Sequence, residues 1–533
     1  MAGALKAASN STLGFLGLNT QDSGVTLEDG YAKQALNCII DKYGRLGSRR
    51  GWQMLTTDNG TLDDTDSIDS VFEFRSLSGS STFLSAGGNK IYKGVSTLVE
   101  IPISDDDASG PVDLVTQPTF TDNRWQWAAL QESTGAATEA NAFAGQIGHP
   151  MLVWREGGGS GPYVLQRIGD YGTIPTGVST FDPDCVHASY GRLWAGRLSE
   201  NRTTVYYSQL LAGASFTGSG SGVLDIGAVV GGNDEIVAIS SHNNFLVIFC
   251  HNNIVIYQNA DDPTNLALAD VITGVGCVAR DTVQQTGTDL IFLSKSGLRS
   301  LQRTVQEKST PMRELSLNIR DDLVAYVGGE AASTIRSVYF ERDALYLLVL
   351  PGLKQTICFD MRAALPNGAS RATVWDGIVP SACISTYDRN LYFGFDGGIG
   401  RYFGYSDNEK GYRLTYFTSN TNFKEPFSLK FLKKAKIILI ASGSQDIVVK
   451  YGFDYNTTYS SRTFTKDIIG GSAEYNLAEY NIGEFTAGVG ISEVALNLGG
   501  SGKVLEFGVE IPINGAPVSL QEMSVYMKTG KIL

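Results

Sequence analysis

Short apolar runs separated by turns that contain glycine or asparagine recur along the middle of the chain. For example, the apolar run Phe245–Cys250 is followed by a polar turn at residues 251–253 and by a second apolar run at residues 254–257. Apolar runs of about four to eight residues around such turns are typical of β-hairpins. The turns centre near residues 88, 157, 200, 252, 296, 352 and 397, so their spacings are about 69, 43, 52, 44, 56 and 45 residues.

These spacings are close to the roughly 40–50 residues that one blade of a β-propeller occupies. A propeller arranges its small sheets in a closed ring and leaves only short strand edges exposed. We therefore predict an all-β chain whose residues 61–404 form a six- to seven-bladed β-propeller core. The alternative is a pair of β-sandwiches in which the spacing is a coincidence.

The segments on either side of these repeats have a different pattern. Residues 1–60 contain a turn at residues 21–24, after which residues 28–38 are predicted to form a helix. From about residue 405 onward the strands become longer and more polar, and residues 431–440 alternate basic and apolar side chains. We predict that residues 1–60 and residues 405–533 build an additional β-rich platform domain from the two ends of the chain.

The chain is acidic. It has 533 residues, of which 42% are hydrophobic, and a net charge of −13. Its length allows a large core divided among about two or three domains. Readers of nucleic acids bind phosphates through clustered lysine and arginine, so an acidic chain is not typical of them. It could still line a conduit through which DNA slides without sticking, although the simpler interpretation is that the charge aids solubility.

Cysteine and histidine are not arranged for metal binding. The six cysteines form no Cys-x-x-Cys pair, and the four histidines do not lie at ligand spacing beside them. These residues are Cys38, Cys185, Cys250, Cys277, Cys358, Cys383, His149, His187, His242 and His251. Most of the cysteines lie in apolar, strand-like runs, as buried thiols do, which favours a reduced, cytosolic site of assembly over a secreted disulfide scaffold. Zinc is therefore not predicted.

Residues 1–10 lack the basic-then-apolar order of a signal peptide. The longest apolar runs, such as Leu345–Leu350, have the length of a strand and fall far short of the roughly 20 apolar residues that span a membrane. We expect no membrane insertion by the chain itself.

Two glycine-rich segments match phosphate-binding motifs only in part. Residues 274–279 fit the loose dinucleotide pattern Gly-x-Gly-x-x-Ala, but no helical apolar stripe follows whose N-terminus could meet a pyrophosphate. Residues 499–503 lack the first glycine of a phosphate loop, and Val504 replaces its magnesium-binding hydroxyl residue. A turn between blades and a hairpin turn are favoured, and no cofactor is predicted.

Two acidic stretches could offer oxygen ligands to calcium. They lie at residues 63–66 and 105–107, and both lack the spaced glycine and the distal glutamate of a hand-type loop. Solvated loops are therefore favoured, and no metal site is predicted.

The sequence carries no catalytic signature. It has no Gly-x-Ser-x-Gly or His-Glu-x-x-His motif, and the dipeptide Trp375-Asp376 is a single copy that does not define a WD repeat. A chain with 55 aspartates and glutamates could pair carboxylates for glycosidase chemistry, but it lacks the Asp-box turns of propeller glycosidases. We predict that the chain is not an enzyme.

Three stretches carry a resemblance to a known family. The first contains an acidic turn, an Ala-x-Asn motif and a basic segment at its end. The second lies in the middle of the chain, and the third is the C-terminal tail. They comprise residues 17–19, 27–30, 35–37, 43–46 and 49–52; residues 191–196, 206–208, 233–237, 245–249, 274–277 and 297–301; and residues 500–504, 517–520 and 528–531. In this order they resemble the tail nozzle, tail tubular protein B and stabilisation proteins of podoviruses.

The resemblance implies a structural component of the virion of a short-tailed bacteriophage. In that family a hexameric ring of propeller-bearing subunits lies below the portal and adaptor rings and forms the channel for DNA ejection, with a gate at the far tip. The implied partners are further copies of the chain, adaptor or portal proteins, tail fibres or a tail-tip protein, and double-stranded DNA that passes without sequence recognition. Assembly would take place in the host cytoplasm. Tip insertions are expected to be reduced or absent, because the chain is shorter than the larger nozzles.

Charged residues offer candidates for contacts in such a ring. The candidate interface residues are Arg45, Arg49, Arg50, Lys433, Lys434 and Lys436. The arginines could pair with carboxylates of a neighbouring component and the lysines could dock an acidic partner. Pairing within the chain and a solvated strand face are the alternatives. The candidate acidic loops of a lumen or gate are Asp63, Asp64, Asp66, Asp105, Asp106 and Asp107, which would repel DNA phosphates over a Debye length of ~8–10 Å.

Two other functions stay open. A host-surface module that binds glycans would be expected to trimerise and to carry a sugar groove rimmed by aromatic residues. A propeller hydrolase would need acidic residues that converge in the central funnel.

Overall fold

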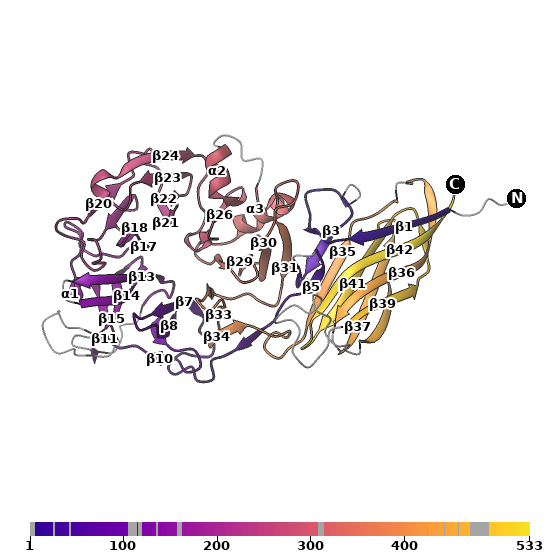
Figure 1. The fold of residues 1–533 in the computed structure, drawn as a ribbon, viewed down its shortest axis with the longest axis horizontal. Coiled ribbons are helices and arrows are strands. Elements are labelled where there is room, and N and C mark those ends of the chain that lie inside the picture. The colour runs from indigo at the N-terminus through magenta and orange to yellow at the C-terminus, as the bar shows by residue number, and fades with distance from the viewer. Residues whose placement is uncertain are drawn as a thin grey trace.

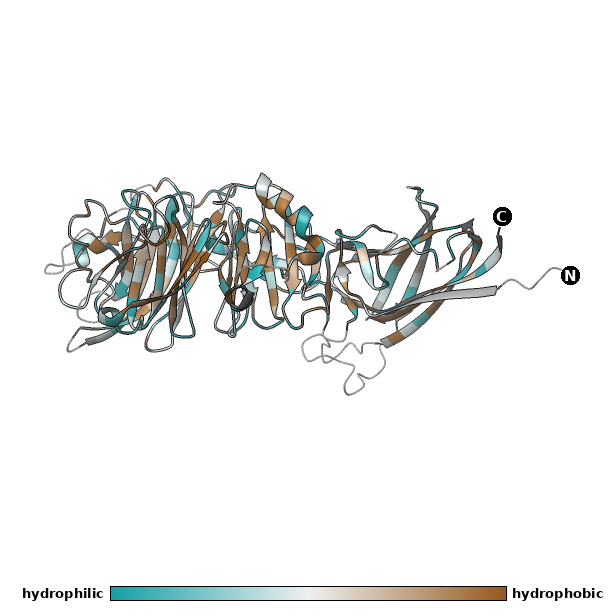
Figure 2. Ribbon diagram, turned by 90° about the horizontal axis from the view of Figure 1, so that it is seen from above, coloured by the Kyte–Doolittle hydropathy of each residue, from teal (hydrophilic) through white to brown (hydrophobic). Residues whose placement is uncertain are grey.

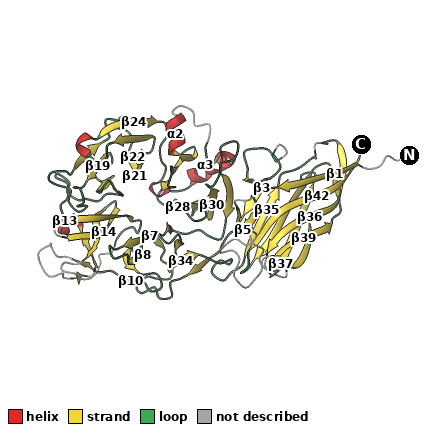
Figure 3. Ribbon diagram, in the orientation of Figure 1, coloured by secondary structure: helices red, strands yellow, loops and turns green. Residues whose placement is uncertain are grey.

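The computed structural model describes residues 6–24, 27–41, 44–104, 114–115, 120–134, 137–156, 163–307, 314–423, 425–441, 443–456, 458–468 and 490–532. The chain consists almost entirely of strands, which form a ring of small sheets at one end of an elongated molecule and a sandwich of two larger sheets at the other (Figures 1 and 3). The prediction of an all-β chain with a propeller core is confirmed.

The ring is a seven-bladed β-propeller, and its first four blades follow one another along the chain. Blade 1 contains β7 (Ile68–Arg75), β8 (Ser81–Gly87), β9 (Lys90–Lys93) and β10 (Val99–Glu100). Blade 2 contains β13 (Gln126–Thr134), β14 (Ala137–Gln146), β15 (His149–Glu156) and β16 (Tyr163–Arg167), with β11 (Ile103–Ser104) and β12 (Leu114–Val115) at its outer edge and α1 (Ile168–Tyr171) after it. Blade 3 contains β17 (Cys185–Ser189), β18 (Arg192–Gly196), β19 (Thr204–Tyr207) and β20 (Gly222–Asp225). Blade 4 contains β21 (Ile236–His242), β22 (Phe245–Cys250), β23 (Asn253–Gln258) and β24 (Ala267–Thr273), with the 3-10 turn η1 (Pro263–Asn265) before its last strand.

The last three blades depart from this simple pattern. Blade 5 follows the 3-10 turn η2 (Arg280–Thr282) and contains β25 (Gln284–Gln285), β26 (Leu290–Ser294) and β27 (Gly297–Ser300), followed by α2 (Leu301–Glu307), η3 (Leu317–Ile319) and α3 (Arg320–Gly329). Blade 6 contains β28 (Arg336–Phe340), β29 (Leu345–Leu350), β30 (Gln355–Asp360) and β31 (Arg371–Trp375). Blade 7 contains β32 (Ala382–Ser385), β33 (Leu391–Phe395), β34 (Gly398–Tyr402) and β6 (Trp52–Met54).

Helix α3 lies beside blade 5. Leu323 and Val327 are one helical turn apart, and both belong to the hydrophobic cluster that contains Leu293 and Leu298 of that blade. The helix therefore packs its apolar side onto the sheet of blade 5.

Strand β6 closes the ring with a segment from the N-terminal part of the chain. It pairs antiparallel with β34, where Gln53 faces Arg401, and the Trp52 ring stacks on Phe395 with ring centroids 4.0 Å apart. The last blade is thus completed by the strand that precedes the first, which removes the open edge that a linear array would leave. Residues 1–60 were predicted to join the platform as a whole, but this part of them belongs to the propeller.

The sandwich is built from both ends of the chain. One sheet has the order β39 (Gly490–Asn497), β36 (Ser428–Ala441), β42 (Val518–Ile532), β5 (Leu46–Ser48) and β4 (Cys38–Ile40), with β1 (Lys6–Leu13) on β42 and β40 (Ser501–Gly502) on β36. The other contains β3 (Tyr31–Leu36), β35 (Tyr412–Thr418), β41 (Leu505–Ile513), β37 (Gly443–Phe453) and β38 (Ser460–Ile468), with β2 (Gly17–Leu18) on β3.

The core of the sandwich follows from strand periodicity. On β36, Leu432, Ala435, Ile437 and Leu439 are buried. The spacing from Leu432 to Ala435 is three residues instead of two because the register shifts between Leu432 and Lys434. Neighbouring residues on a strand point to opposite faces, so the alternating pattern in the sequence buries one face of this long strand. Figure 2 shows hydrophobic residues alternating along the strands of both the propeller and the sandwich.

The propeller and the sandwich share one sheet. Strand β31 of blade 6 pairs in parallel with β3, where Leu36 faces Val374, and β3 pairs with β35 of the sandwich. The result is a ten-stranded sheet that runs from β28 to β38. Within this sheet the two parts meet at this one residue pair, where the Asn37 N–H donates to the Val374 carbonyl at 2.7 Å.

The predicted helix at residues 28–38 is wrong. Residues 31–36 form β3, and Cys38–Ile40 form β4, which pairs with β5. Within β3, Tyr31, Ala32 and Ala35 are buried, and Ala35 faces Tyr416 of β35. Pairing with a strand almost 400 residues later outweighs a local helix preference, which is only a weak guide.

Among the residues that the structure describes, no helix is long and apolar enough to cross a membrane.

Candidate functional site

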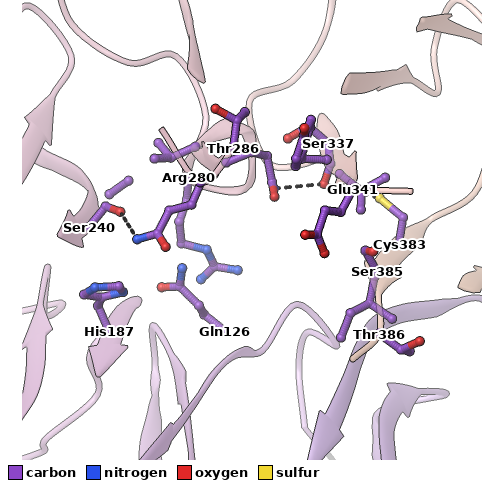
Figure 4. A pocket seen from close by; sticks show the side chains of 18 of the residues that line it. Gln126, His187, Ser240, Arg280, Thr286, Ser337, Glu341, Cys383, Ser385 and Thr386 are labelled. Carbon is purple, nitrogen blue, oxygen red and sulfur yellow. Dashed lines mark hydrogen bonds between the residues drawn. The ribbon is translucent and has the colours of Figure 1, made fainter. Parts of the chain in front are cut away.

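A funnel-shaped cavity of about 650 Å³ lies among the inner strands of the propeller. It is lined from β17, β21, β25, β28 and β32, the innermost strands of blades 3 to 7, and by Gln126 at the start of β13 (Figure 4). Inner strands that converge on one axis create such a space because their side chains cannot fill it completely. Cavities of this size are default candidates for ligand binding.

Neutral polar side chains dominate the wall of this funnel. Gln285 donates from Nε2 to the Ser241 carbonyl at 2.9 Å, and Gln284 donates from Nε2 to the Ser337 carbonyl at 3.1 Å. Gln126 accepts the backbone N–H of Val186 at 2.8 Å. Gln285 also donates from Nε2 to the Ser240 hydroxyl at 3.5 Å. These amides suit a ligand that both donates and accepts hydrogen bonds.

The ionisable groups of the funnel are few. Burial lowers the pKa of His187 to about 4, and its Nε2 lies 3.0 Å from the Ser241 hydroxyl. Burial raises the pKa of the Cys383 thiol to about 12, so at neutral pH it is not a thiolate nucleophile. Within the described lining, Glu341 is the one carboxylate, and hydrolysis of a glycoside by the usual route needs two.

A network of ion pairs lies at the other end of the inner strands. It surrounds a second cavity of about 240 Å³ that shares Gln126, Arg280, Gln284 and Ser337 with the funnel. Arg124 Nε and Arg280 Nε each lie 2.8 Å from a different oxygen of Asp281, and Arg336 Nη1 lies 3.5 Å from it.

The network binds several blades to one another. Arg124 precedes β13 of blade 2, Asp184 precedes β17 of blade 3, Arg280 and Asp281 precede blade 5, and Arg336 begins β28 of blade 6. Arg280 also pairs with Asp184 at 2.6 Å. Contacts among blades that are distant in sequence stabilise the closed ring.

Electrostatics keeps the carboxylates of this network ionised. Burial alone would raise the pKa of Asp281, but Arg124, Arg280 and Arg336 outweigh it and hold that pKa far below its usual range. Burial likewise acts to raise the pKa of Asp184, and its arginine neighbours lower it overall. Arginine remains protonated, so these ion pairs are formed at neutral pH.

The candidate arginines of the ring interface differ in their accessibility. Arg49 is fully buried, and its Nη1 and Nη2 each lie 2.7 Å from a carboxylate oxygen of Asp407. Arg45 pairs with Asp41 in the same chain, and Arg50 is half-buried. Arg49 and Arg45 therefore pair within the chain, which was the alternative to a contact with a neighbouring subunit. Because Arg49 is buried, it cannot contact a neighbouring subunit.

The candidate lysines lie on β36. Lys433 and Lys434 are exposed, whereas Lys436 is half-buried and pairs with Glu493 of β39 at 3.2 Å. Whether the lysines contact a neighbouring subunit or only water stays a prediction.

The candidate acidic loop at residues 63–66 lies directly before β7. Asp63 and Asp64 are exposed, Asp66 is half-buried, and the Asp66 carbonyl accepts the N–H of Gly397 at 2.9 Å. None of the three lines the funnel or the second cavity. Asp105, Asp106 and Asp107 lie outside the described residues.

The glycine-rich segments that partly match phosphate-binding motifs connect elements of the fold. Residues 274–279 connect β24 of blade 4 to η2 before blade 5, and residues 499–503 connect β39 to β41 through β40. All six cysteines are free thiols, five buried and Cys383 half-buried. The described part of the chain holds no cluster of three or more histidine, cysteine, aspartate or glutamate side chains that could bind a metal.

The ion-pair network was not predicted. Its one signal in the sequence is the pair Arg280-Asp281, which follows the segment tested as a dinucleotide motif. Arg124 and Arg336 are far away in the chain, so their convergence depends on the closure of the ring.

Comparison with known proteins gives structural similarity alone. No family model matches the chain, and no curated protein matches it. The extracellular domain of the one component system BT4673 from B. thetaiotaomicron is 10% identical with a TM-score of 0.40, and the alignment covers 89% of this chain and 61% of that one. The chain therefore spans about three fifths of that domain's length.

Two other similar structures are propellers with lower coverage of this chain. The WD40 domain of Neurospora crassa Pan2 is 7% identical with a TM-score of 0.36, covering 67% of this chain and 95% of that one. Drosophila Semaphorin 2a is 9% identical with a TM-score of 0.36, covering 67% and 76%.

Proposed function

We propose that the chain is a structural subunit of the tail nozzle of a short-tailed bacteriophage. In this proposal several copies form a ring that connects the portal and adaptor to the tail tip and borders the channel for DNA ejection. The proposal rests on the sequence resemblance, and one structural observation favours it most: strands of the propeller and of the sandwich belong to one ten-stranded sheet, joined where Leu36 of β3 pairs with Val374 of β31.

A continuous sheet suits a part that transmits force between neighbours. Domains joined by flexible linkers move relative to one another by default. Here the backbone pairing of β31 with β3 is reinforced by Arg49, whose guanidinium lies 4.0 Å from the ring centroid of Tyr412 and contacts Asp407. A subunit reinforced in this way keeps its shape when a ring is loaded along its axis.

The proposal places the DNA channel between copies of the chain and not inside one propeller. Arg124, Arg280, Arg336 and Asp281 occupy one end of the propeller's central space. A duplex therefore needs a wider passage, which a closed ring of identical subunits provides. The net charge of −13 would limit adhesion of DNA to its wall.

The test is assembly of the purified full-length chain. Mass measurement and negative-stain microscopy are expected to show closed rings of six copies, the number that the resemblance to podovirus nozzles implies. The double variant Lys434→Glu and Lys436→Glu is expected to weaken the rings if β36 docks an acidic neighbour. Lys93→Glu, at the exposed last residue of β9 in the propeller, is the matched control. Reconstruction of the virion should locate the chain below the portal. A chain that stays monomeric at all concentrations and is missing from the particle would contradict the proposal.

The funnel supports a second candidate function, binding of a glycan on the host surface. Tyr387 at its rim is 73% exposed, and the Arg75 guanidinium lies 3.9 Å from the centroid of its ring. Amides below an exposed aromatic ring are a common way to hold sugar hydroxyls and a sugar face. Glycan-array binding by the isolated chain that is lost in Tyr387→Ala but kept in Tyr455→Ala would favour this function, and no binding would remove it.

A further inference from the structure

The second cavity of the propeller carries an excess of positive charge inside an acidic protein. Its wall contains the guanidinium groups of Arg124, Arg280 and Arg336 and the carboxylates of Asp69 and Asp281. Three positive charges thus face two negative ones. Asp184 pairs with Arg280 at 2.6 Å but also with Arg197 at 2.5 Å, so counting both Asp184 and Arg197 leaves the excess of one positive charge unchanged.

Hydrogen-bond donors in this cavity are left over after the ion pairs have formed. Arg280 donates from Nε, Nη1 and Nη2 to Asp281, Asp184 and the Arg124 carbonyl. Arg124 uses Nε for Asp281, and Arg336 uses Nε and Nη1 for backbone carbonyls. Within the described part of the chain, Nη1 and Nη2 of Arg124 and Nη2 of Arg336 make no hydrogen bond.

The environment of Arg336 makes the excess charge costly. Burial lowers the pKa of Arg336, and the neighbouring Arg124 and Arg280 lower it further, against the opposing effect of Asp281. Burial also raises the pKa of Asp69. A buried cation without full compensation is stabilised strongly by any anion that reaches it.

We infer that this cavity is a binding site for a small oxyanion of the phosphate type. Its volume of about 240 Å³ is several times the ~30 Å³ that one water molecule occupies, so a tetrahedral ion of five heavy atoms fits. The free N–H groups of Arg124 and Arg336 are donors of the kind that bind the oxygens of such an ion. Chloride carries one charge and no paired oxygens, so it would gain less from these donors than phosphate would.

The same chemistry could be presented in two forms, as a free ion or as a phosphate ester. The cavity shares Gln126, Gln284 and Ser337 with the wider funnel, whose wall of amides and hydroxyls suits a polyol. A phosphorylated polyol would therefore gain contacts that inorganic phosphate cannot make. This site does not depend on the ring assembly proposed above.

The experiment is isothermal titration of the full-length chain with inorganic phosphate and, separately, with glycerol phosphate at constant ionic strength. Saturable binding of one ion per chain is expected, and 100 mM chloride should compete poorly. Stronger binding of glycerol phosphate would identify the ester as the ligand form, and equal or weaker binding would identify the free ion.

Two variants with opposite expected effects make the test specific. Arg124→Gln removes one charge and two donors and should weaken phosphate binding about tenfold or more. Asp69→Asn removes a repelling carboxylate and should strengthen binding several-fold, a gain that damage to the fold would not produce. Arg202→Gln, which removes an exposed partner of Glu235 at the outer end of the network, should leave binding unchanged.

Circular dichroism of each variant checks that the fold is intact. The inference is overturned if the wild-type chain shows no saturable binding at millimolar phosphate, if chloride competes as well as phosphate does, or if Asp69→Asn fails to strengthen binding.

Discussion

Arg49 joins the propeller to the sandwich through contacts that a surface arginine would not make. Its guanidinium pairs with Asp407, donates from Nε to the Asn37 side-chain oxygen at 3.0 Å and stacks on Tyr412. Burial acts to lower the pKa of Arg49, but Asp407 outweighs it and the pKa is raised overall. An arginine in a basic stretch looks like a surface residue in the sequence, and only the fold shows that it is buried.

Replacing Arg49 with methionine is expected to destabilise the protein by about 3–5 kcal/mol, because Asp407 loses the buried guanidinium that balances its charge. The shift of the denaturant midpoint measures this loss. Arg413→Met is the control: Arg413 pairs with Glu510 at 3.2 Å but is 66% exposed, so its loss should cost at most about 1 kcal/mol. Equal effects of the two substitutions would show that Arg49 does not stabilise the junction.

His187 should give the protein a dependence on pH in the acidic range. Burial lowers its pKa from 6.5 to about 4, so folding favours the neutral ring. The unfolded chain binds a proton below about pH 6.5 that the folded chain takes up only near pH 4, and stability is therefore lost as the pH falls through this window.

The measurement compares thermal midpoints at pH 7.5 and pH 4.5 for the wild type and for His187→Gln. Glutamine can still bond the Ser241 hydroxyl but does not titrate, so the variant should lose less stability on acidification. The same loss in both proteins would assign the acid sensitivity to other groups.

At the scale of elements, hairpins were the most predictable part of the fold. The turns near residues 252, 296, 352 and 397 were predicted from local residue types, and each joins two paired strands of one blade. Such turns depend on backbone preferences within a few residues. The turn near residue 157 lies outside the described residues.

Elements whose partners are distant in sequence were predicted less well. Strand β6 joins β34, and β3 joins β31 and β35, although several hundred residues separate them. No local sequence pattern at residues 28–38 or 52–54 indicates which strands they pair with. The ion-pair network was missed for the same reason, since its arginines meet only when the blades close.

Strand β6 should be needed for closure of the ring through its backbone. Gln53 is exposed and faces Arg401 in the ladder with β34. Gln53→Pro removes the donor of one ladder hydrogen bond and should lower stability by about 1–3 kcal/mol. Gln53→Ala keeps the N–H and is the matched control, with an expected change within about 0.5 kcal/mol in the denaturant midpoint. If proline is as well tolerated as alanine, pairing of β6 contributes little to closure.

At the scale of the whole molecule, the shared sheet predicts how the protein unfolds. Chains of several independent domains usually unfold in separate steps. Here the sheet from β28 to β38 belongs to both parts, so neither can lose it alone. Calorimetry is expected to show one cooperative transition for the wild type, and two resolved transitions would contradict the mechanical coupling that the nozzle proposal uses.

Strands near the N-terminus pair with strands near the C-terminus, and this limits how much of the protein can fold while it is still being synthesised. Residue 6 finds its partner at residue 529, and Trp52 finds its partner at residue 402. The N-terminal strands therefore stay unpaired until most of the chain has been synthesised. Contacts between residues so far apart in sequence also form slowly. Closely spaced ribosomes on one message would bring unpaired strands of different chains together, so the yield of folded protein should rise when fewer ribosomes translate each message.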